Sequence, residues 1–169
     1  MEKIGKRIVI VGVSASGKST FARKLSEKAK LPFFLMDAIM WNPGWQYIGD
    51  EATVEKLKEI GSKEEWIIEG YISTEARTFL FERADTIIYL DYRPIVATLR
   101  YLKRWLKHRK NPRPELEGCP EKFDWEFLKL VWTKGEAISL NKFLAQVKNQ
   151  DKLIKLTSVS QTDNFIRNI

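Results

Sequence analysis

The segment Gly12–Ser19, with the sequence GVSASGKS, constrains this chain more than any other, because its glycines, lysine and serine have the spacing of a phosphate-binding loop. A β-branched run over residues 7–11 precedes it and predicts a strand that is buried on both faces. Apolar residues at helical spacing follow it from Lys18 to about Ala29 and predict a helix. This order of strand, glycine-rich turn and helix is the context that the motif requires.

The chemistry of phosphate binding gives each part of this loop a role. Gly12 and Gly17 permit backbone conformations that turn consecutive N–H groups toward phosphate oxygens. Lys18 adds a positive charge for the β- and γ-phosphates, and Ser19 is placed to ligate Mg²⁺. The predicted nucleotide contacts are Gly12, Val13, Ser14, Ala15, Ser16, Gly17, Lys18, Ser19 and Thr20. We therefore expect the chain to bind ATP with Mg²⁺, and the sequence leaves the preference for ATP over GTP open.

Apolar runs alternate with helical patterns along the whole chain. Strands are predicted at 7–11, 33–36, 66–68, 86–90 and 153–156, and helices at 18–29, 51–60, 73–82, 94–109, 124–147 and 163–169, the fifth helix with a break near Gly135. This alternation predicts an α/β fold with a parallel sheet and right-handed crossovers. At 169 residues the chain has the length of one domain, expected to span 1–169.

Composition excludes several kinds of protein. The single cysteine cannot form an intramolecular disulfide, and a single histidine leaves no Cys/His zinc site. No stretch approaches the roughly 18 apolar residues of a membrane span, and the N-terminal residues lack the apolar core of a signal peptide. We therefore expect a cytoplasmic protein without a membrane partner. The sequence does not fix the oligomeric state, with a monomer slightly favoured.

The net charge of +7 is concentrated between Arg93 and Arg113, a segment without any acidic residue. Such a basic excess is typical either of a solvated surface or of a surface that binds polyanions. No helix-turn-helix, zinc finger or basic tail is visible in the sequence. Binding to nucleic acid is therefore expected to be at most weak and non-specific.

Four further segments resemble a known family. They are residues 35–45 with LMD and WNPGW, residues 66–71 with WIIEGY, residues 83–91 with RADTIIYLD, and residues 117–124 with EGCPEKFD. Together with the loop they resemble adenylate-kinase-related P-loop proteins described as DNA topology modulation or FlaR-related proteins, and the likeness covers nearly the whole chain. It implies a fold like that of nucleoside monophosphate kinases, with a five-stranded parallel sheet in the order 2-3-1-4-5 and helices on both faces. It also implies an acceptor-side segment at about 37–64 and a lid after strand 4 at about 107–122, in which Arg109 and Arg113 would add positive charge.

Two carboxylates are candidates for the metal and the acceptor. The resemblance implies that Glu69, at the end of the third strand, orients Mg²⁺; a capping or salt-bridge role is the alternative, and Asp91 is the rival carboxylate. Asp37, at the end of the second strand, lies where α/β proteins place ligand groups, and it could hold or deprotonate an acceptor hydroxyl. A helix or turn cap is the alternative for Asp37.

Four further residues have predicted roles at the substrates. Trp41 could stack on an acceptor ring, or belong to the core. The resemblance places Arg77 near an acceptor phosphate, with a surface salt bridge equally open. Arg100 and Arg104 lie one helical turn apart, and the resemblance implies that they stabilise the transferring phosphoryl group from the side opposite Lys18, a solvated basic face being the alternative.

The favoured hypothesis is an Mg²⁺-dependent kinase that transfers the γ-phosphoryl group of ATP to a small acceptor, with Lys18, Arg100, Arg104 and Asp37 as catalytic residues. A second hypothesis is a nucleotide-dependent regulatory or DNA-associated protein without kinase turnover. A third is an ATPase switch without an acceptor. The sequence does not name the acceptor, because discrimination among acceptors depends on pocket shape.

Overall fold

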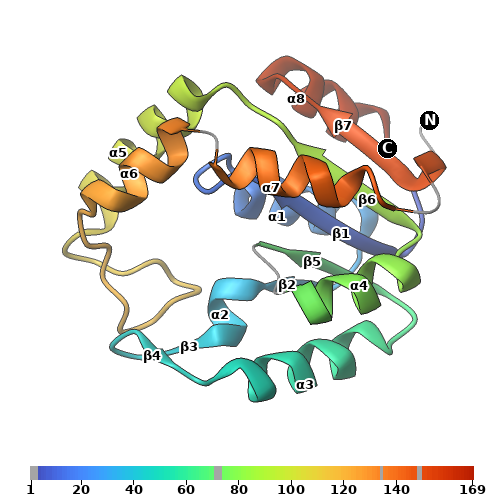
Figure 1. Cartoon of the computed structure of the whole chain (residues 1–169), viewed down its shortest axis with the longest axis horizontal. Helices are drawn as coiled ribbons and strands as arrows, with labels where there is room; N and C mark the ends of the chain where they lie inside the picture. The colour runs from blue at the N-terminus through green and yellow to red at the C-terminus, as the bar shows by residue number, and fades with distance from the viewer. Residues whose placement is uncertain (1–3, 71–73, 134, 148–149) are drawn as a thin grey trace.

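A five-stranded parallel sheet forms the centre of the protein (Figure 1). The computed structural model describes residues 4–70, 74–133, 135–147 and 150–169. The strands are β1 (Arg7–Gly12), β2 (Phe33–Leu35), β5 (Trp66–Glu69), β6 (Thr86–Leu90) and β7 (Leu153–Leu156), in the spatial order β2-β5-β1-β6-β7. This is the predicted order 2-3-1-4-5, so the predicted fold class is confirmed. Ile8 of the central strand pairs with Ile67 on one side and with Thr86 on the other.

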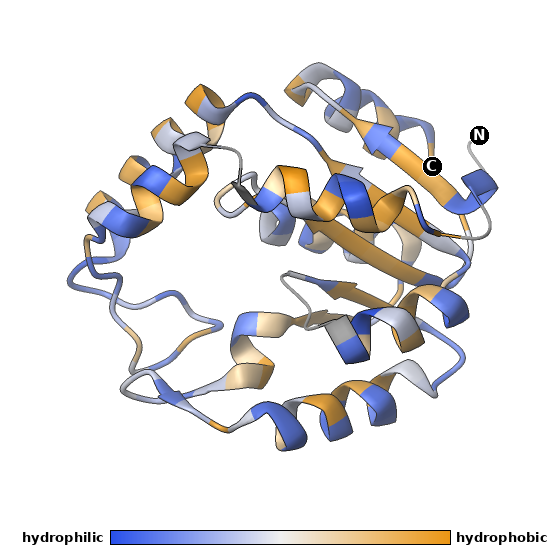
Figure 2. Ribbon diagram, viewed as in Figure 1, coloured by the Kyte–Doolittle hydropathy of each residue, from blue (hydrophilic) through white to orange (hydrophobic). Residues whose placement is uncertain are grey.

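The side chains of β1 alternate between two apolar layers, because successive residues of a strand point to opposite faces. Val9 and Val11 pack in a cluster with residues of α3 (Asp50–Gly61), α4 (Thr74–Arg83) and α7 (Gly135–Leu144). Ile8 and Ile10 pack in a second cluster with residues of α1 (Lys18–Ala29) and α8 (Val159–Asn168). Helices therefore cover both faces of the sheet, and its strands are largely hydrophobic (Figure 2).

Several predicted boundaries are corrected by the structure. The second strand ends at Leu35, and residues from Met36 to Met40 form the short helix α2, so Asp37 lies in the first turn of a helix. The terminal helix starts at Val159, one turn earlier than predicted, because the Ser158 hydroxyl accepts a hydrogen bond from the Gln161 N–H and caps it. The predicted break is confirmed: α6 (Trp125–Thr133) and α7 are separate helices. The helix predicted at 73–82 corresponds to α4, and its predicted first residue, Ser73, lies outside the described residues.

Residues 109–124 join α5 (Pro94–His108) to α6 and lie against the β3–β4 hairpin (Trp41–Asn42 and Gln46–Tyr47). Gly44 N–H donates to the Gly118 carbonyl at 2.9 Å, and the Trp45 indole N–H donates to the Pro120 carbonyl at 2.9 Å. A Cβ atom at Gly118, where φ is +72°, would lie 2.8 Å from Pro43. The predicted lid and the predicted acceptor-side segment are therefore in contact. Among the described residues, none of the helices has the length and apolar character needed to cross a membrane.

Candidate active site

The phosphate-binding loop joins β1 to α1, and its conformation depends on glycine and on a neighbouring arginine. Gly17 has φ of +93°, a left-handed conformation that side chains rarely adopt, and it immediately precedes α1. A Cβ atom there would lie 2.7 Å from Nη1 of Arg100. The same Nη1 donates a hydrogen bond to the Ser16 carbonyl. Close approach of the α5 arginine to the loop therefore requires glycine at this position.

Lys18 lies against the loop that precedes it. Its Nζ donates to the carbonyl oxygens of Gly12 at 3.0 Å and Val13 at 2.9 Å. Burial lowers the pKa of Lys18, and the nearby carboxylates, Glu69 foremost, oppose that shift. The lysine is thus held at the loop, near the carboxylates of Glu69, Glu136 and Asp37.

Glu69 meets Ser19 at the end of β5. The Ser19 hydroxyl donates to Oε1 of Glu69 at 2.9 Å, and the glutamate side chain is buried. Burial raises the pKa of Glu69, while Lys18 and the Ser19 hydrogen bond oppose the rise. The rival carboxylate, Asp91, instead forms an ion pair with Lys155 of β7, at 2.7 Å. Of the two candidates for the metal site, the structure brings Glu69 to Ser19.

The donor set suits a magnesium ion that is shared with a nucleotide. Within the described ranges, no three His, Cys, Asp or Glu side chains come together as a ready metal cluster. A hydroxyl and a carboxylate oxygen are hard ligands of the kind that Mg²⁺ prefers, and Mg²⁺ commonly takes its remaining ligands from phosphates and water. Ser19 and Glu69 therefore fit a Mg²⁺ ion bound together with a nucleotide.

A second carboxylate at the loop was not predicted from the sequence. Glu136, at the start of α7, accepts hydrogen bonds from the Ser14 backbone N–H at 2.6 Å and from the Ser14 hydroxyl at 2.8 Å. The two residues are 122 positions apart in the chain, so no local pattern reveals the contact. The carboxylate ties α7 to the phosphate-binding loop.

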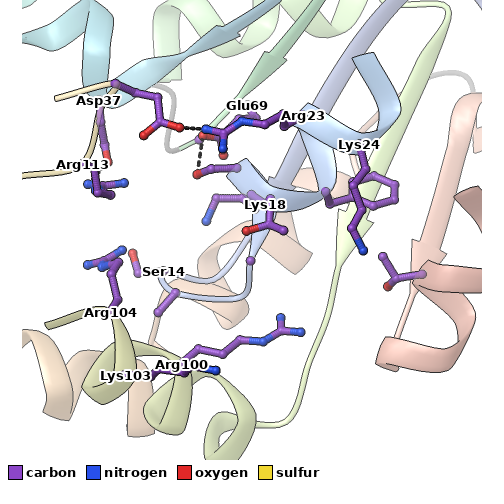
Figure 3. Close-up of a pocket in the computed structure, with 18 of the residues that line it drawn as sticks. Ser14, Lys18, Arg23, Lys24, Asp37, Glu69, Arg100, Lys103, Arg104 and Arg113 are labelled. Carbon is purple, nitrogen blue, oxygen red and sulfur yellow. Dashed lines mark hydrogen bonds and ion pairs between the residues drawn. The ribbon is translucent and has the colours of Figure 1, made fainter. Parts of the chain in front are cut away.

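A cavity of about 710 Å³ extends from this loop to Asp37, α5 and α8 (Figure 3). Its ionic lining consists of eight Lys and Arg residues against four carboxylates, an excess that suits a polyphosphate. The cations are Lys18, Arg23, Lys24, Arg100, Lys103, Arg104, Lys107 and Arg113, and the carboxylates are Asp37, Glu69, Glu115 and Asp163. Six of the predicted nucleotide contacts line it as well: Ser14, Ala15, Gly17, Lys18, Ser19 and Thr20.

Arg100 and Arg104 both line the cavity, on the side of the loop opposite Asp37 and Glu69 (Figure 3). The Arg100 guanidinium lies over the Tyr92 ring, 4.8 Å from its centroid. Nε of Arg104 lies 3.1 Å from Oε1 of Glu121. The predicted pairing of these arginines on one side of α5 is therefore what the structure has.

Asp37 is linked across the cavity to the connection between α5 and α6. Nη2 of Arg113 lies 3.2 Å from Oδ2 of Asp37, and Nε of Arg113 lies 3.1 Å from Oε1 of Glu121. Glu121 thus contacts the guanidinium groups of both Arg104 and Arg113. The sequence contains Glu121 only as part of a family motif, and nothing in its spacing marks it as a site residue.

Three residues with predicted or suggested roles do not line the cavity. Trp41 packs edge-on against Trp45 at 5.7 Å between ring centroids. The Arg77 guanidinium is buried over the Phe143 ring of α7 at 4.7 Å, because α4 and α7 pack on the same face of the sheet. Arg109 lies over the ring of Trp105. The structure therefore does not bring these side chains to the site.

Several known kinases have sequences or folds similar to those of this chain. No model of a known protein family matches the chain. A shikimate kinase from Flavobacterium psychrophilum is 32% identical over 127 residues, which cover 67% of this chain and 72% of that protein. The solved shikimate kinase from Bacteroides thetaiotaomicron aligns with a TM-score of 0.61 at 20% identity, over 96% of this chain and 94% of the other. A gluconokinase from Sinorhizobium meliloti aligns with a TM-score of 0.57 at 19% identity, over 98% and 90% of the two chains.

Proposed function

Since this chain belongs to the shikimate-kinase-like family of P-loop kinases, we propose that it transfers the γ-phosphoryl group of ATP to a hydroxyl group of a small acceptor. As a member of this family the protein is an ATP-dependent phosphotransferase. The observation that carries the proposal is that the phosphate-binding loop, Asp37 and two α5 arginines line the same cavity. Phosphoryl transfer requires these groups together, because catalysis consists almost entirely of positioning and charge stabilisation.

Each group has a place in this mechanism. The loop N–H groups and Lys18 would hold the β- and γ-phosphates. Ser19 and Glu69 would hold a Mg²⁺ ion, which would neutralise part of the phosphate charge. Asp37 accepts a hydrogen bond from the acceptor hydroxyl and orients its oxygen toward the γ-phosphorus. Arg100 and Arg104 approach from α5 and stabilise charge on the transferring group, at no cost in reorganisation because their neighbours fix them.

We propose two further assignments along the chain. Residues of about 37–64 form the acceptor side, and residues of about 107–122 form a lid within the single domain 1–169. Contacts of the second segment with both sides of the cavity support the lid: Glu115 pairs with Arg23 of α1, and Arg113 pairs with Asp37. Closure of such a segment would exclude water from the transferring phosphoryl group.

The resemblance to topology modulation proteins stays a prediction, and it suggests the competing function of a nucleotide-dependent DNA-associated protein. The cationic side chains of α5 that line the cavity, Arg100, Lys103, Arg104 and Lys107, favour a small polyanion over duplex DNA. We propose that nucleic acid binds weakly, without sequence preference, and dissociates as salt rises. A sequence-specific site held at nanomolar affinity in physiological salt would favour the competing function.

The test is release of ADP from Mg-ATP in the presence of a panel of nucleoside monophosphates, nucleosides and small hydroxylated compounds. Turnover that depends on one acceptor and yields its phosphate ester identifies a kinase. ADP release that is the same with and without every panel compound points instead to an ATPase switch. Lys18→Ala serves as the blank for contaminating activity, since it lacks the charge that holds the β- and γ-phosphates.

A further inference from the structure

A protein carboxylate occupies two hydrogen-bond donors of the phosphate-binding loop. The Ser14 backbone N–H donates to Oε2 of Glu136 at 2.6 Å, and the Ser14 hydroxyl donates to Oε1 at 2.8 Å. Ser14 itself lines the cavity (Figure 3). N–H and hydroxyl donors suit a carboxylate and a phosphate alike, because both acceptors are anionic. Glu136 therefore holds a place at the loop that a phosphate group would otherwise take.

This place lies at the part of the loop that would meet the terminal phosphates. In loops of this kind the lysine reaches the β- and γ-phosphates. Nζ of Lys18 donates to the carbonyl oxygens of the two residues that precede Ser14. Burial lowers the pKa of Lys18, and the charges of Glu69 and Glu136 oppose that shift, so Glu136 lies within electrostatic reach of the ammonium group. The carboxylate and a γ-phosphate would therefore compete for the same surroundings.

Other contacts, which do not involve Glu136, also hold the loop in its conformation. The Ser16 N–H donates to the Val13 carbonyl at 3.1 Å and closes the turn around Ser14. Arg100 of α5 donates a hydrogen bond to the Ser16 carbonyl. Release of Glu136 would therefore leave the backbone of the loop in place and its donors free for phosphate.

The contact also joins the loop to the helices that pack around it. Glu136 lies in the first turn of α7, and Figure 1 shows that turn beside the loop between β1 and α1. The next residue, Ala137, packs in one apolar cluster with Val13 of the loop, Ala97 of α5 and Val131 of α6. A phosphate that displaced the carboxylate would therefore act directly on the start of α7.

From these contacts we propose that Glu136 determines which nucleotide the loop prefers. Its carboxylate takes the place of a γ-phosphate at Ser14, so the site favours a nucleoside diphosphate, and a triphosphate binds only by displacing Glu136. The reason is that two like charges at short distance repel each other, and a repulsive group is a common source of specificity. This inference rests on the proposed function, because it assigns the loop to ATP and ADP.

Calorimetry in the absence of any acceptor tests the role of Glu136. Mg-ADP and Mg-AMP-PNP, a triphosphate analogue that resists hydrolysis, are titrated into the full chain and into Glu136→Gln, which keeps the shape of the side chain without its charge. AMP-PNP should bind the variant about tenfold or more tightly than the wild type, and ADP should change less than about threefold. Glu126→Gln is the matched control, since Glu126 is exposed in the first turn of α6 and does not line the cavity.

A second measurement needs only the wild type, and it decides the question if Glu136→Gln does not fold. Crystal structures of the full chain are compared with Mg-ADP and with Mg-AMP-PNP bound. The two hydrogen bonds from Ser14 to Glu136 should persist with the diphosphate and be broken with the triphosphate. Bonds that stay intact beside a bound γ-phosphate would overturn the inference.

The calorimetry has contrary outcomes as well. If Glu136→Gln bound both nucleotides as the wild type does, or if both affinities changed alike, Glu136 would not discriminate between them. A weaker affinity for AMP-PNP alone would mean that the carboxylate assists the triphosphate, which is the opposite of the proposal. Each of these results leaves the kinase proposal intact, because that proposal is judged by ADP release with an acceptor. Conversely, a panel without turnover counts against the kinase proposal, while the expected change in the affinity ratio would still establish the role of Glu136.

Discussion

The two ends of the cavity are built in different ways. At the nucleotide end, all of the predicted contacts come from one continuous segment, residues 12–20, whose backbone N–H groups and Lys18 suit phosphate. At the acceptor end, Asp37, Arg104, Arg113 and Glu121 come from α2, α5 and the connection that follows α5. A backbone site depends on local conformation, whereas a site of paired side chains depends on how distant segments pack.

We therefore expect substitutions at the two ends of the cavity to affect different quantities, namely nucleotide affinity and turnover. Changes at the loop should act on nucleotide affinity, because its groups contact phosphates that are present in the ground state. Changes at the acceptor end should act on turnover, because those groups orient the acceptor hydroxyl.

The largest effect is expected for Asp37→Asn, which removes the carboxylate at the acceptor hydroxyl. Turnover of an identified acceptor should fall about 10²–10⁴-fold, the usual contribution of a positioned acid or base, while Mg-ATP affinity stays nearly unchanged. Steady-state ADP release and calorimetry measure the two quantities. Asp91→Asn is the matched control, since Asp91 pairs with Lys155 away from the cavity. Equal loss in both variants would refute the special role of Asp37.

A smaller effect, on affinity, is expected for Lys18→Ala. Loss of a charge-assisted contact costs about 1.5–3 kcal/mol, so Mg-ATP should bind about 10–100-fold more weakly. Lys28→Ala, an exposed position in the last turn of the same helix, should bind ATP normally. Unchanged ATP affinity in Lys18→Ala would show that this lysine does not hold the nucleotide.

A still smaller, pH-dependent effect is expected for Glu69→Gln. Burial raises the pKa of Glu69 above its ordinary value of 4.5, so a proton competes with Mg²⁺ at higher pH than at an exposed glutamate. Mg²⁺-dependent nucleotide binding should therefore weaken as pH falls toward the raised pKa, with a proton released on binding. Titrations of Mg²⁺ at several pH values measure this. In Glu69→Gln the affinity should be several-fold lower at neutral pH, and this pH dependence should disappear.

The smallest kinetic effect is expected for Arg77→Ala. Its guanidinium packs over Phe143 and does not line the cavity, so KM and turnover should change less than about twofold. Stability should fall instead, by about 1–2 kcal/mol for loss of a buried cation–π contact and its packing. Thermal unfolding and acceptor kinetics separate the two. A large rise in the acceptor KM with an unchanged melting temperature would restore the predicted contact with an acceptor phosphate.

The phosphate-binding loop and the five strands could be predicted from the sequence alone. The loop is encoded by consecutive residues, and glycine at position 17 meets a conformational requirement that few other residues satisfy. The strands are encoded by short apolar runs, which the sheet buries on both faces. Both signals are local, so they need no knowledge of the rest of the fold. The order of the strands followed from a family resemblance, and the structure confirms it.

Which side chains meet in the cavity depends on tertiary packing, which the sequence pattern does not reveal. Two carboxylates end apolar strands, yet only Glu69 lies against Ser19, because β5 and β6 flank β1 on opposite sides. Asp37 and Arg113 are 76 positions apart, and Ser14 and Glu136 are 122 apart. Such contacts depend on how helices and connections pack over the end of the sheet, where shifts of an ångström or two make or break an ion pair. No spacing in the sequence encodes that packing, and it made Glu121 the partner of two arginines while it buried Arg77 under another helix.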